Sequence, residues 1–242
     1  MNGKLFRSAL HLLLPTSCAL CGAGSDDTLC AACVDQFFGA AAAPRCHCCA
    51  NPVVAGATLC GHCIAARPAF DCTLVACDYA LPVDQLVLQL KFGHRLALAA
   101  LMARRLAVVT AAAAAESPGA LPDLLCPVPL GPRRLAQRGY NQALEIARPL
   151  ARSLGVALHA RLVARTRETA AQSSVAPEDR RANIAGAFAV PVPALALVRG
   201  RHIGVVDDVM TSGGTLDEMA ATLKRHGAAR VSNLVFARTP PH

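Results

Sequence analysis

The chain has 242 residues, a formal net charge of +8 and a hydrophobic fraction of 54%. This length accommodates one α/β domain plus a small module, and the basic charge favours polyanionic partners such as diphosphate or nucleic acid. No apolar run reaches the ~18 residues of a membrane span. Lys4, Arg7 and the short apolar run after them lack a small-x-small cleavage site, so we expect a soluble, cytoplasmic protein.

The N-terminal third is rich in cysteine: eleven of the twelve cysteines lie at or before Cys77. Eight of them form four C-x-x-C pairs, Cys18/Cys21, Cys30/Cys33, Cys46/Cys49 and Cys60/Cys63. Each pair can direct two thiolates at one cation, and two pairs complete a closed tetrahedral site, so the pattern predicts two structural Zn²⁺ ions. A disulfide framework is the competing interpretation, which a reducing cytosol disfavours.

The spacing leaves the partnership of these pairs open. Sequential pairing needs only short connections between the ligands of each ion, and a crossed pairing is also compatible with the sequence. His47 and Cys48 lie inside the third pair and are alternative ligands there. We expect residues 1–70 to form a short amphipathic helix followed by a double zinc-ribbon module.

From residue 71 to residue 242 the pattern changes to alternating strands and helices, which is typical of an α/β domain. Cys72, Cys77 and Cys126 lie in apolar runs there and are expected to be buried. The expected elements are strand 73–76, helix 82–91, helix 96–109, a connection over 111–122, strand 124–128, a basic turn over 130–142, helix 143–154, strands 162–165, 187–190 and 203–206, and helix 216–226.

Positive charge is concentrated in one stretch. Residues 133–181 contain ten Arg, no Lys and four acidic residues, a local charge of +6. Because Arg forms bidentate contacts with phosphate, Arg133, Arg134 and Arg138 in the basic turn are candidates for diphosphate binding. The polar stretch from Arg165 to Asn183 is too long for a plain turn and is either functional or a surface loop. A solvated basic surface is the alternative explanation of the charge.

The run from Gly204 to Thr215 places two carboxylates at the end of a strand and a small-residue loop at the start of a helix. The loop residues offer backbone N–H groups and hydroxyls at the positive end of that helix, where a phosphate is stabilised. Asp207 and Asp208 can accept hydrogen bonds from vicinal hydroxyls and can hold a Mg²⁺ ion that a diphosphate also ligates. The run predicts a ribose 5-phosphate site, the alternative being an ordinary Gly-rich turn with a helix-capping acid pair.

This run resembles the signature that binds phosphoribosyl diphosphate (PRPP) in type I phosphoribosyltransferases, with Ser212 in place of the usual second Thr. Further motifs occur in the same order as in the ComF family of ComFC- and GntX-like proteins, and the chain resembles that family from about Leu14 onward. The motifs are LLLPTSCALC at 12–21, the later Cys pairs, LKF at 90–92, PVPL at 127–130, RRLAQRGYNQA at 133–143, RTRETAAQ at 165–172, RRANIAGAF at 180–188 and VVDDVMTSGGTL at 205–216.

The resemblance implies a type I phosphoribosyltransferase-like parallel sheet flanked by helices over residues 71–242. It implies Asp207 and Asp208 as the ribose-facing and metal-facing acids, and Arg138 with its neighbours as diphosphate contacts. The implied 5-phosphate site is Thr211, Ser212, Gly213, Gly214 and Thr215, and Val206 is a further implied ligand-binding residue. The implied ligand is PRPP with Mg²⁺.

Three roles are compatible with this resemblance. The first is a phosphoribosyltransferase whose acceptor no sequence pattern identifies, acting in DNA uptake or nucleotide metabolism. The second is a competence protein that binds single-stranded DNA, works with DNA-uptake proteins and uses its PRPP site for regulation. The third is a zinc-ribbon protein that docks a partner through its N-terminal module, with a vestigial sugar site.

Overall fold

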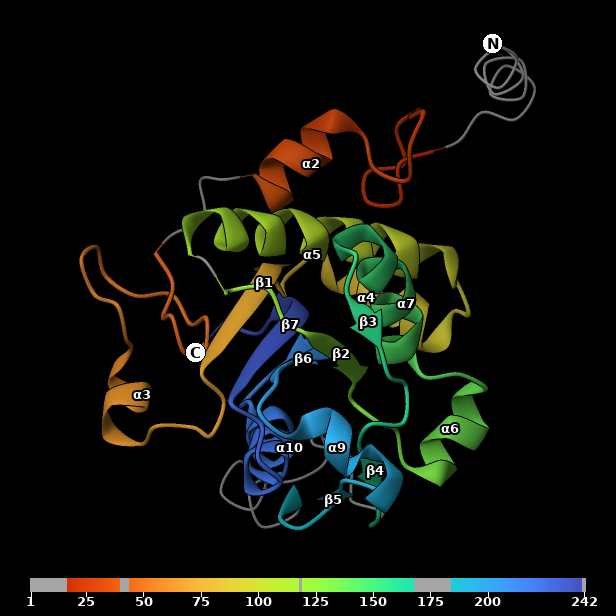
Figure 1. Ribbon diagram of the computed structural model, residues 1–242. Helices are drawn as coiled ribbons and strands as arrows, with labels where there is room; N and C mark the ends of the chain where they lie inside the picture. The colour runs from red at the N-terminus through yellow and green to blue at the C-terminus, as the bar shows by residue number, and fades with distance from the viewer. Residues whose placement is uncertain (1–16, 40–43, 118, 168–183, 241–242) are drawn as a thin grey trace.

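The computed structural model describes residues 17–39, 44–117, 119–167 and 184–240 (Figure 1). The helix predicted before Cys18 and residues 168–183 of the polar stretch lie outside the described residues. The main sheet has five strands in the order β1, β7, β6, β2, β3, and every pair of neighbours is parallel. Its strands are β1 (Cys72–Asp78), β7 (Arg230–Arg238), β6 (His202–Met210), β2 (Leu124–Pro127) and β3 (Ala157–Leu158). The predicted parallel α/β fold is confirmed.

Helices cover both faces of this sheet (Figure 1). One face is covered by α4 (Asp84–Phe92), α5 (Ala97–Glu116) and α7 (Gln142–Leu154), and the other by α10 (Gly214–Arg225). Side chains alternate between the faces of a strand. In β6, Val206 accordingly packs with α4, α5 and α7, whereas Val205 packs with α10. Both faces are therefore buried, which explains the continuous apolar runs of the central strands.

Helix α5 is longer than predicted. The sequence indicated a helix ending near Val109 and a connection from Ala111, but the helix continues to Glu116 because Ala is the strongest helix former. An 18-residue window of α5 has a mean hydropathy of 1.6, so this helix is long and apolar enough to cross a membrane. The expectation that no run reaches that length is therefore wrong. In the structure α5 packs on β1, β7 and α7 and buries Leu98 and Leu106.

The basic turn expected over 130–142 contains a helix, α6 (Pro132–Arg138). Pro132 occupies the first helical turn, where its missing N–H costs nothing. Gly139 ends the helix in the left-handed conformation with φ of 75°. Asn141 then caps α7 by accepting a hydrogen bond from the Ala143 N–H at 3.0 Å. The arginines of this segment therefore lie on a helix and not on an irregular turn.

Strand β7 was not predicted, although it lies between β1 and β6 in the sheet. The strands expected at 162–165 and 187–190 are present in shorter form as β4 (Ala164–Arg165) and β5 (Phe188–Ala189), which pair antiparallel. A 3₁₀ turn (Val192–Ala194) and the short helix α9 (Leu195–Val198) follow. This small sheet lies near α10, at the bottom of the molecule in Figure 1.

The two cysteine-rich ribbons pack on opposite faces of the sheet. The first ribbon, residues 17–39, contains α2 (Ala31–Phe38), whose Phe38 ring lies 5.9 Å from the ring of Phe236 in β7. The second ribbon, residues 44–66, contains α3 (Gly61–Ala65), and its Cys46 and Cys63 belong to the core cluster of α10. The described part of the predicted N-terminal module thus shares its apolar cores with the α/β domain.

Gly204 in β6 occupies a position that a larger residue would overpack. A β-carbon there would lie 2.5 Å from Leu125 Cδ2 and 2.9 Å from Leu234 Cδ1. We expect Gly204→Ala to lower the free energy of unfolding by about 1–3 kcal/mol, measured by denaturant titration. Gly24→Ala is the control, since a β-carbon there meets no atom within 4 Å. Equal stability of the two variants would contradict this packing.

Candidate functional site

The two predicted acids lie near the carboxyl end of β6, which runs on to Met210. Asp208 is buried, whereas Asp207 is partly exposed. The backbone N–H of Asp208 donates a hydrogen bond of 2.9 Å to Asp207 Oδ1. Both carboxylates are fixed by a strand and not by a loop, since β7 pairs with β6 at Asp207 and the pairing of β2 with β6 ends just before it, at Val206.

The loop after β6 has the geometry of an anion-binding turn. Gly213 has φ of 84° and precedes α10, which has twelve residues. Glycine adopts this backbone angle without strain, and a β-carbon on Gly213 would lie 2.5 Å from Met210 Cε, so that side chain would have to move. The N–H groups of Gly213 and its neighbours then lie at the positive end of the α10 dipole, where a phosphate binds favourably.

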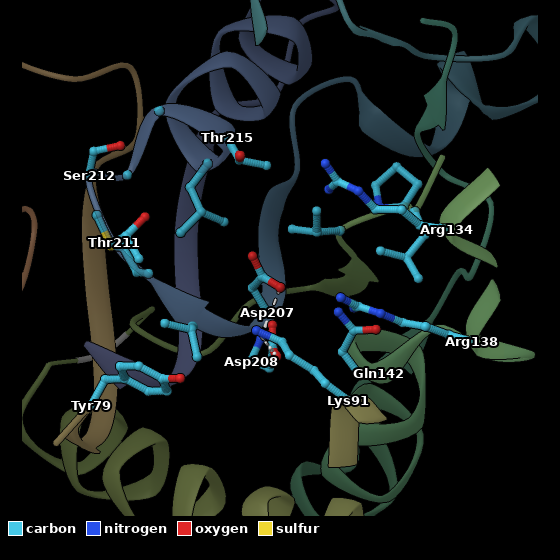
Figure 2. Close-up of a pocket in the computed structure, with 18 of the residues that line it drawn as sticks. Tyr79, Lys91, Arg134, Arg138, Gln142, Asp207, Asp208, Thr211, Ser212 and Thr215 are labelled. Carbon is cyan, nitrogen blue, oxygen red and sulfur yellow. Dashed lines mark hydrogen bonds and ion pairs between the residues drawn. The ribbon is translucent and has the colours of Figure 1, made fainter. Parts of the chain in front are cut away.

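A cavity of about 430 Å³ opens between this loop and α6. In Figure 2 the loop residues lie on one side, Arg134 and Arg138 reach in from the other, and Asp207 lies between them. The predicted residues that line the cavity are Asp207, Asp208, Thr211, Ser212, Gly213, Gly214, Thr215, Arg134 and Arg138. The fold therefore brings most of the predicted site residues into one cavity.

Two predicted ligand-binding residues do not line this cavity. Val206 is completely buried and packs with the helices on one face of the sheet, so its side chain supports the strand. Arg133 lies on the solvent-exposed part of α6, while Arg134 and Arg138 of the same helix line the cavity.

Several lining residues were not assigned to the site from the sequence. The most prominent is Lys91 of α4, whose Nζ forms an ion pair of 2.7 Å with Asp208 Oδ2 (Figure 2). The others include Tyr79, Phe92, Gln142 and Arg165. Lys91 and Phe92 belong to the LKF motif, which was the one sequence signal for their involvement. These residues come from elements distant in sequence, so only the fold shows that they share a site.

The negative charge of Asp207 and Asp208 is only partly compensated by nearby positive charge. Burial and the neighbouring charge of Asp208 raise the pKa of Asp207 well above that of an ordinary aspartate, and Lys91 offsets this only in part. Two adjacent carboxylates with one ammonium group as a neighbour attract further cations. The site therefore favours a ligand that brings positive charge or hydroxyl donors to Asp207.

The eight C-x-x-C cysteines form two groups of four. Within each group the sulfur atoms lie within 4.8 Å of one another, which fits a tetrahedral Zn²⁺ ion. The groups are Cys18, Cys21, Cys30 and Cys33, and Cys46, Cys49, Cys60 and Cys63. The pairing is thus sequential. His47 and Cys48 stand outside both groups, and the Cys48 thiol instead contacts the carbonyl of Phe70 at 3.7 Å.

The structure lowers the pKa of one thiol in each group, Cys18 and Cys46, whereas burial and neighbouring cysteines raise the pKa of Cys33 and Cys49. Burial raises the pKa of Cys18, but hydrogen bonds from the backbone of Cys21 and Cys30 outweigh it and lower the pKa to about 6. Similar backbone hydrogen bonds lower the pKa of Cys46 to about 7. Ionised thiolates are the form that binds zinc. All twelve cysteines are free thiols, and Cys72, Cys77 and Cys126 are buried as predicted.

Comparison with known proteins agrees with this architecture. Residues 9–64 match the double zinc ribbon domain and residues 140–241 match the phosphoribosyl transferase domain. The chain is 36% identical to the DNA utilization protein YhgH of Escherichia coli over 194 residues, which cover 80% of this chain and 84% of the relative. It is 30% identical to competence protein F of Haemophilus influenzae over 210 residues, which cover 87% and 90% of the two chains. The chain therefore belongs to the ComF family, with a double zinc ribbon followed by a phosphoribosyltransferase domain.

Proposed function

We propose that this protein binds PRPP together with Mg²⁺ in the cavity above β6 and acts as a ComF-type phosphoribosyltransferase-like protein. The observation that carries the proposal is the single cavity of about 430 Å³ lined by the phosphate-binding loop, the acid pair and two arginines. This volume lies in the range of small-molecule sites. Anion-binding groups at two sides of an acid pair match a sugar that carries phosphates at both ends.

Each part of PRPP has a matching part of the cavity. The loop from Thr211 to Thr215 at the start of α10 receives the 5-phosphate. Asp207 and Asp208 accept hydrogen bonds from the ribose hydroxyls. Arg134 and Arg138 lie across the cavity from the loop and contact the diphosphate (Figure 2).

The residues present fit a divalent cation beside the acids. Asp207 is partly exposed to the cavity, and its raised pKa reflects carboxylate charge that Lys91 leaves uncompensated. Oxygen ligands from one or two carboxylates plus substrate phosphates are the usual environment of Mg²⁺. When bound, the ion stabilises negative charge on the departing diphosphate.

The chemistry that this arrangement supports is transfer of the phosphoribosyl group. The bond between C1 of the ribose and the diphosphate oxygen breaks, and its electron pair leaves with the diphosphate. A nucleophilic atom of the acceptor forms the new bond to C1 and loses its proton. The protein contributes by holding the sugar in position and by placing Arg134 and Arg138 at the developing charge.

The names of the relatives support a biological setting. They include a DNA utilization protein and a competence protein, which supports a role for this chain in DNA uptake together with other uptake proteins. Free thiols in two zinc-binding groups fit a reducing compartment, so we place the protein in the cytoplasm.

Binding of single-stranded DNA is a second candidate function, favoured by one specific observation. Phe92 lies at the cavity with 63% of its surface exposed, and the Arg138 guanidinium lies 5.1 Å from the centre of its ring. An exposed aromatic ring next to arginines is the combination on which nucleic-acid bases stack. A strand bound there would present a base to the cavity in which PRPP binds.

Replacing both acids tests the PRPP site. We expect the Asp207→Asn, Asp208→Asn double variant to lose Mg²⁺-dependent PRPP binding by at least about 100-fold while remaining folded, because ribose and metal contacts both depend on these carboxylates. Calorimetric titration with and without Mg²⁺ measures the affinity, and Asp35→Asn on the exposed part of α2 is the control. Unchanged PRPP affinity in the double variant would refute the site. Diphosphate release with added bases or DNA then tests turnover.

The raised pKa of Asp207 predicts a stability effect that depends on pH. The folded state favours the protonated form, so this group contributes stability at low pH and loses it as pH rises through the raised pKa. Asp207→Asn should therefore raise the Tm of the zinc-loaded, ligand-free protein at pH 8.5 and raise it less at pH 6. Each kcal/mol corresponds to about 2–4 °C in a chain of this size. A lower Tm of the variant at pH 8.5 would contradict the charge balance described for the pair.

The second function is tested through Phe92. Stacking of one base contributes about 1–3 kcal/mol, so Phe92→Ala should weaken binding of a labelled oligo-dT by about 5- to 150-fold, whereas Phe92→Trp should retain it. Fluorescence anisotropy at several salt concentrations measures the affinity and its electrostatic part. Ile64→Ala is the matched control, since Ile64 is an exposed apolar side chain in the second ribbon. Equal effects of the Phe92 and Ile64 variants would exclude stacking.

A further inference from the structure

Arg238 ends β7 and lies next to Met210, the last residue of β6. Only 5% of this residue is exposed. Its Nη1 donates hydrogen bonds to the carbonyl of Met210 at 3.1 Å, to the carbonyl of Thr211 and to the carbonyl of Thr239 at 2.7 Å. Its Nε donates to the carbonyl of Cys49 at 3.1 Å. One buried guanidinium therefore joins the start of the phosphate-binding loop to a zinc ligand of the second ribbon.

Two further contacts connect the segment after the second ribbon to the same loop. The N–H of Ala69 donates a hydrogen bond of 2.6 Å to Asp217 Oδ1, in the first turn of α10. Phe70 is buried, and a β-carbon on Gly213 would lie 4.0 Å from its ring. A small cavity of about 50 Å³ lies between the ribbon and the loop. The second ribbon thus forms the wall behind the phosphate-binding loop.

The first ribbon has no equivalent position. Its Cys18 and Cys33 pack in the core cluster of α5 and Phe236, whereas Cys49 and Cys63 of the second ribbon pack in the cluster of α10. The two zinc groups are chemically alike, with four cysteines each. They differ in the part of the fold against which they pack. Removing zinc from one group or from the other can therefore be compared within one chain.

We propose that Arg238 is a positioning residue that makes the order of the phosphate-binding loop depend on zinc in the second ribbon. The proposal rests on the proposed function in taking the loop as the 5-phosphate site. A buried guanidinium must keep its hydrogen-bond acceptors, because an unpaired buried charge is costly. Holding the carbonyls of Met210 and Thr211 fixes the direction of the N–H groups that follow. Zinc fixes Cys49, and Arg238 passes that constraint to the loop.

Arg45 provides a matched control for this role. Its Nη1 donates to the carbonyl of Ala50 at 3.1 Å and to Asp78 Oδ1 at 3.0 Å, so it joins the same ribbon to the end of β1. Arg45 contacts β1, which β7 separates from β6, and neither of these hydrogen bonds is to the phosphate-binding loop. If Arg238 only attached the ribbon to the sheet, loss of Arg45 would have the same consequence as loss of Arg238.

The first experiment compares Arg238→Met, Arg238→Lys and Arg45→Met in the full-length, zinc-loaded protein. Hydrogen exchange of residues 211–216 reports loop order, and titration with PRPP reports binding. We expect Arg238→Met to accelerate exchange of the loop and to weaken PRPP binding by at least about 10-fold, with partial recovery in Arg238→Lys, whereas Arg45→Met leaves both near wild type. Unchanged loop exchange in Arg238→Met, or an equal change in Arg45→Met, would overturn the proposal.

The second experiment tests the dependence on zinc. Cys60→Ser removes one ligand from the second zinc group, and Cys30→Ser removes one ligand from the first. Both residues are partly exposed. We expect each variant to lose one zinc per chain, and only Cys60→Ser to accelerate loop exchange. Cys60→His restores a four-ligand site and should restore slow exchange. Faster loop exchange in Cys30→Ser than in Cys60→Ser would refute the assignment.

The two readouts separate this inference from the proposed function. If wild-type protein binds no PRPP, the proposed function fails, while hydrogen exchange still decides whether Arg238 and the second zinc order the loop. If wild-type protein binds PRPP but exchange and affinity are unaffected by Arg238→Met, the function stands and the positioning role is refuted.

Discussion

The constraint on which the structure depends is the placement of two adjacent carboxylates on a central strand. Asp207 and Asp208 directly follow the part of β6 that has paired strands on both sides, and Lys91 of α4 supplies a compensating charge. Desolvation and mutual repulsion make this pair unfavourable for folding. The surrounding apolar packing on both faces of the sheet offsets that cost. Such a concentration of uncompensated charge is typical of a ligand site.

The candidate site is assembled from two structural units that do not depend on the same contacts. On one side the loop is held by β6, α10 and the second ribbon, with Arg238 and Phe70 behind it. On the other side α6 presents Arg134 and Arg138, and its position depends on Gly139 and on the cap of α7. A ligand that bridges the two sides would couple them, which is what a sugar with phosphates at both ends would do.

The parts that could be predicted from the sequence are those determined by local chemistry. Asp207, Asp208 and the loop lie in one continuous run, and each C-x-x-C pair carries its own ligands. The parts that could not be predicted depend on tertiary contacts: Lys91 reaches Asp208 only because α4 and β6 share one apolar core. Strand β7 was missed although its apolar run was visible. The role of Arg238 at the end of β7 could not be predicted because it depends on buried partners that are distant in sequence. The sequential zinc pairing likewise required the distances between sulfur atoms.

The use of zinc near a phosphate-binding loop has a physical explanation. The second ribbon has 23 residues, from 44 to 66, and a segment of that length cannot bury enough apolar surface to be rigid by itself. Four thiolates on one ion supply the rigidity that a core would otherwise provide. The loop needs a fixed wall because glycine at 213 leaves its backbone with few restraints of its own. The glycine in the loop allows a ligand to approach the backbone closely. The metal-fixed ribbon behind the loop keeps the N–H groups in a defined direction.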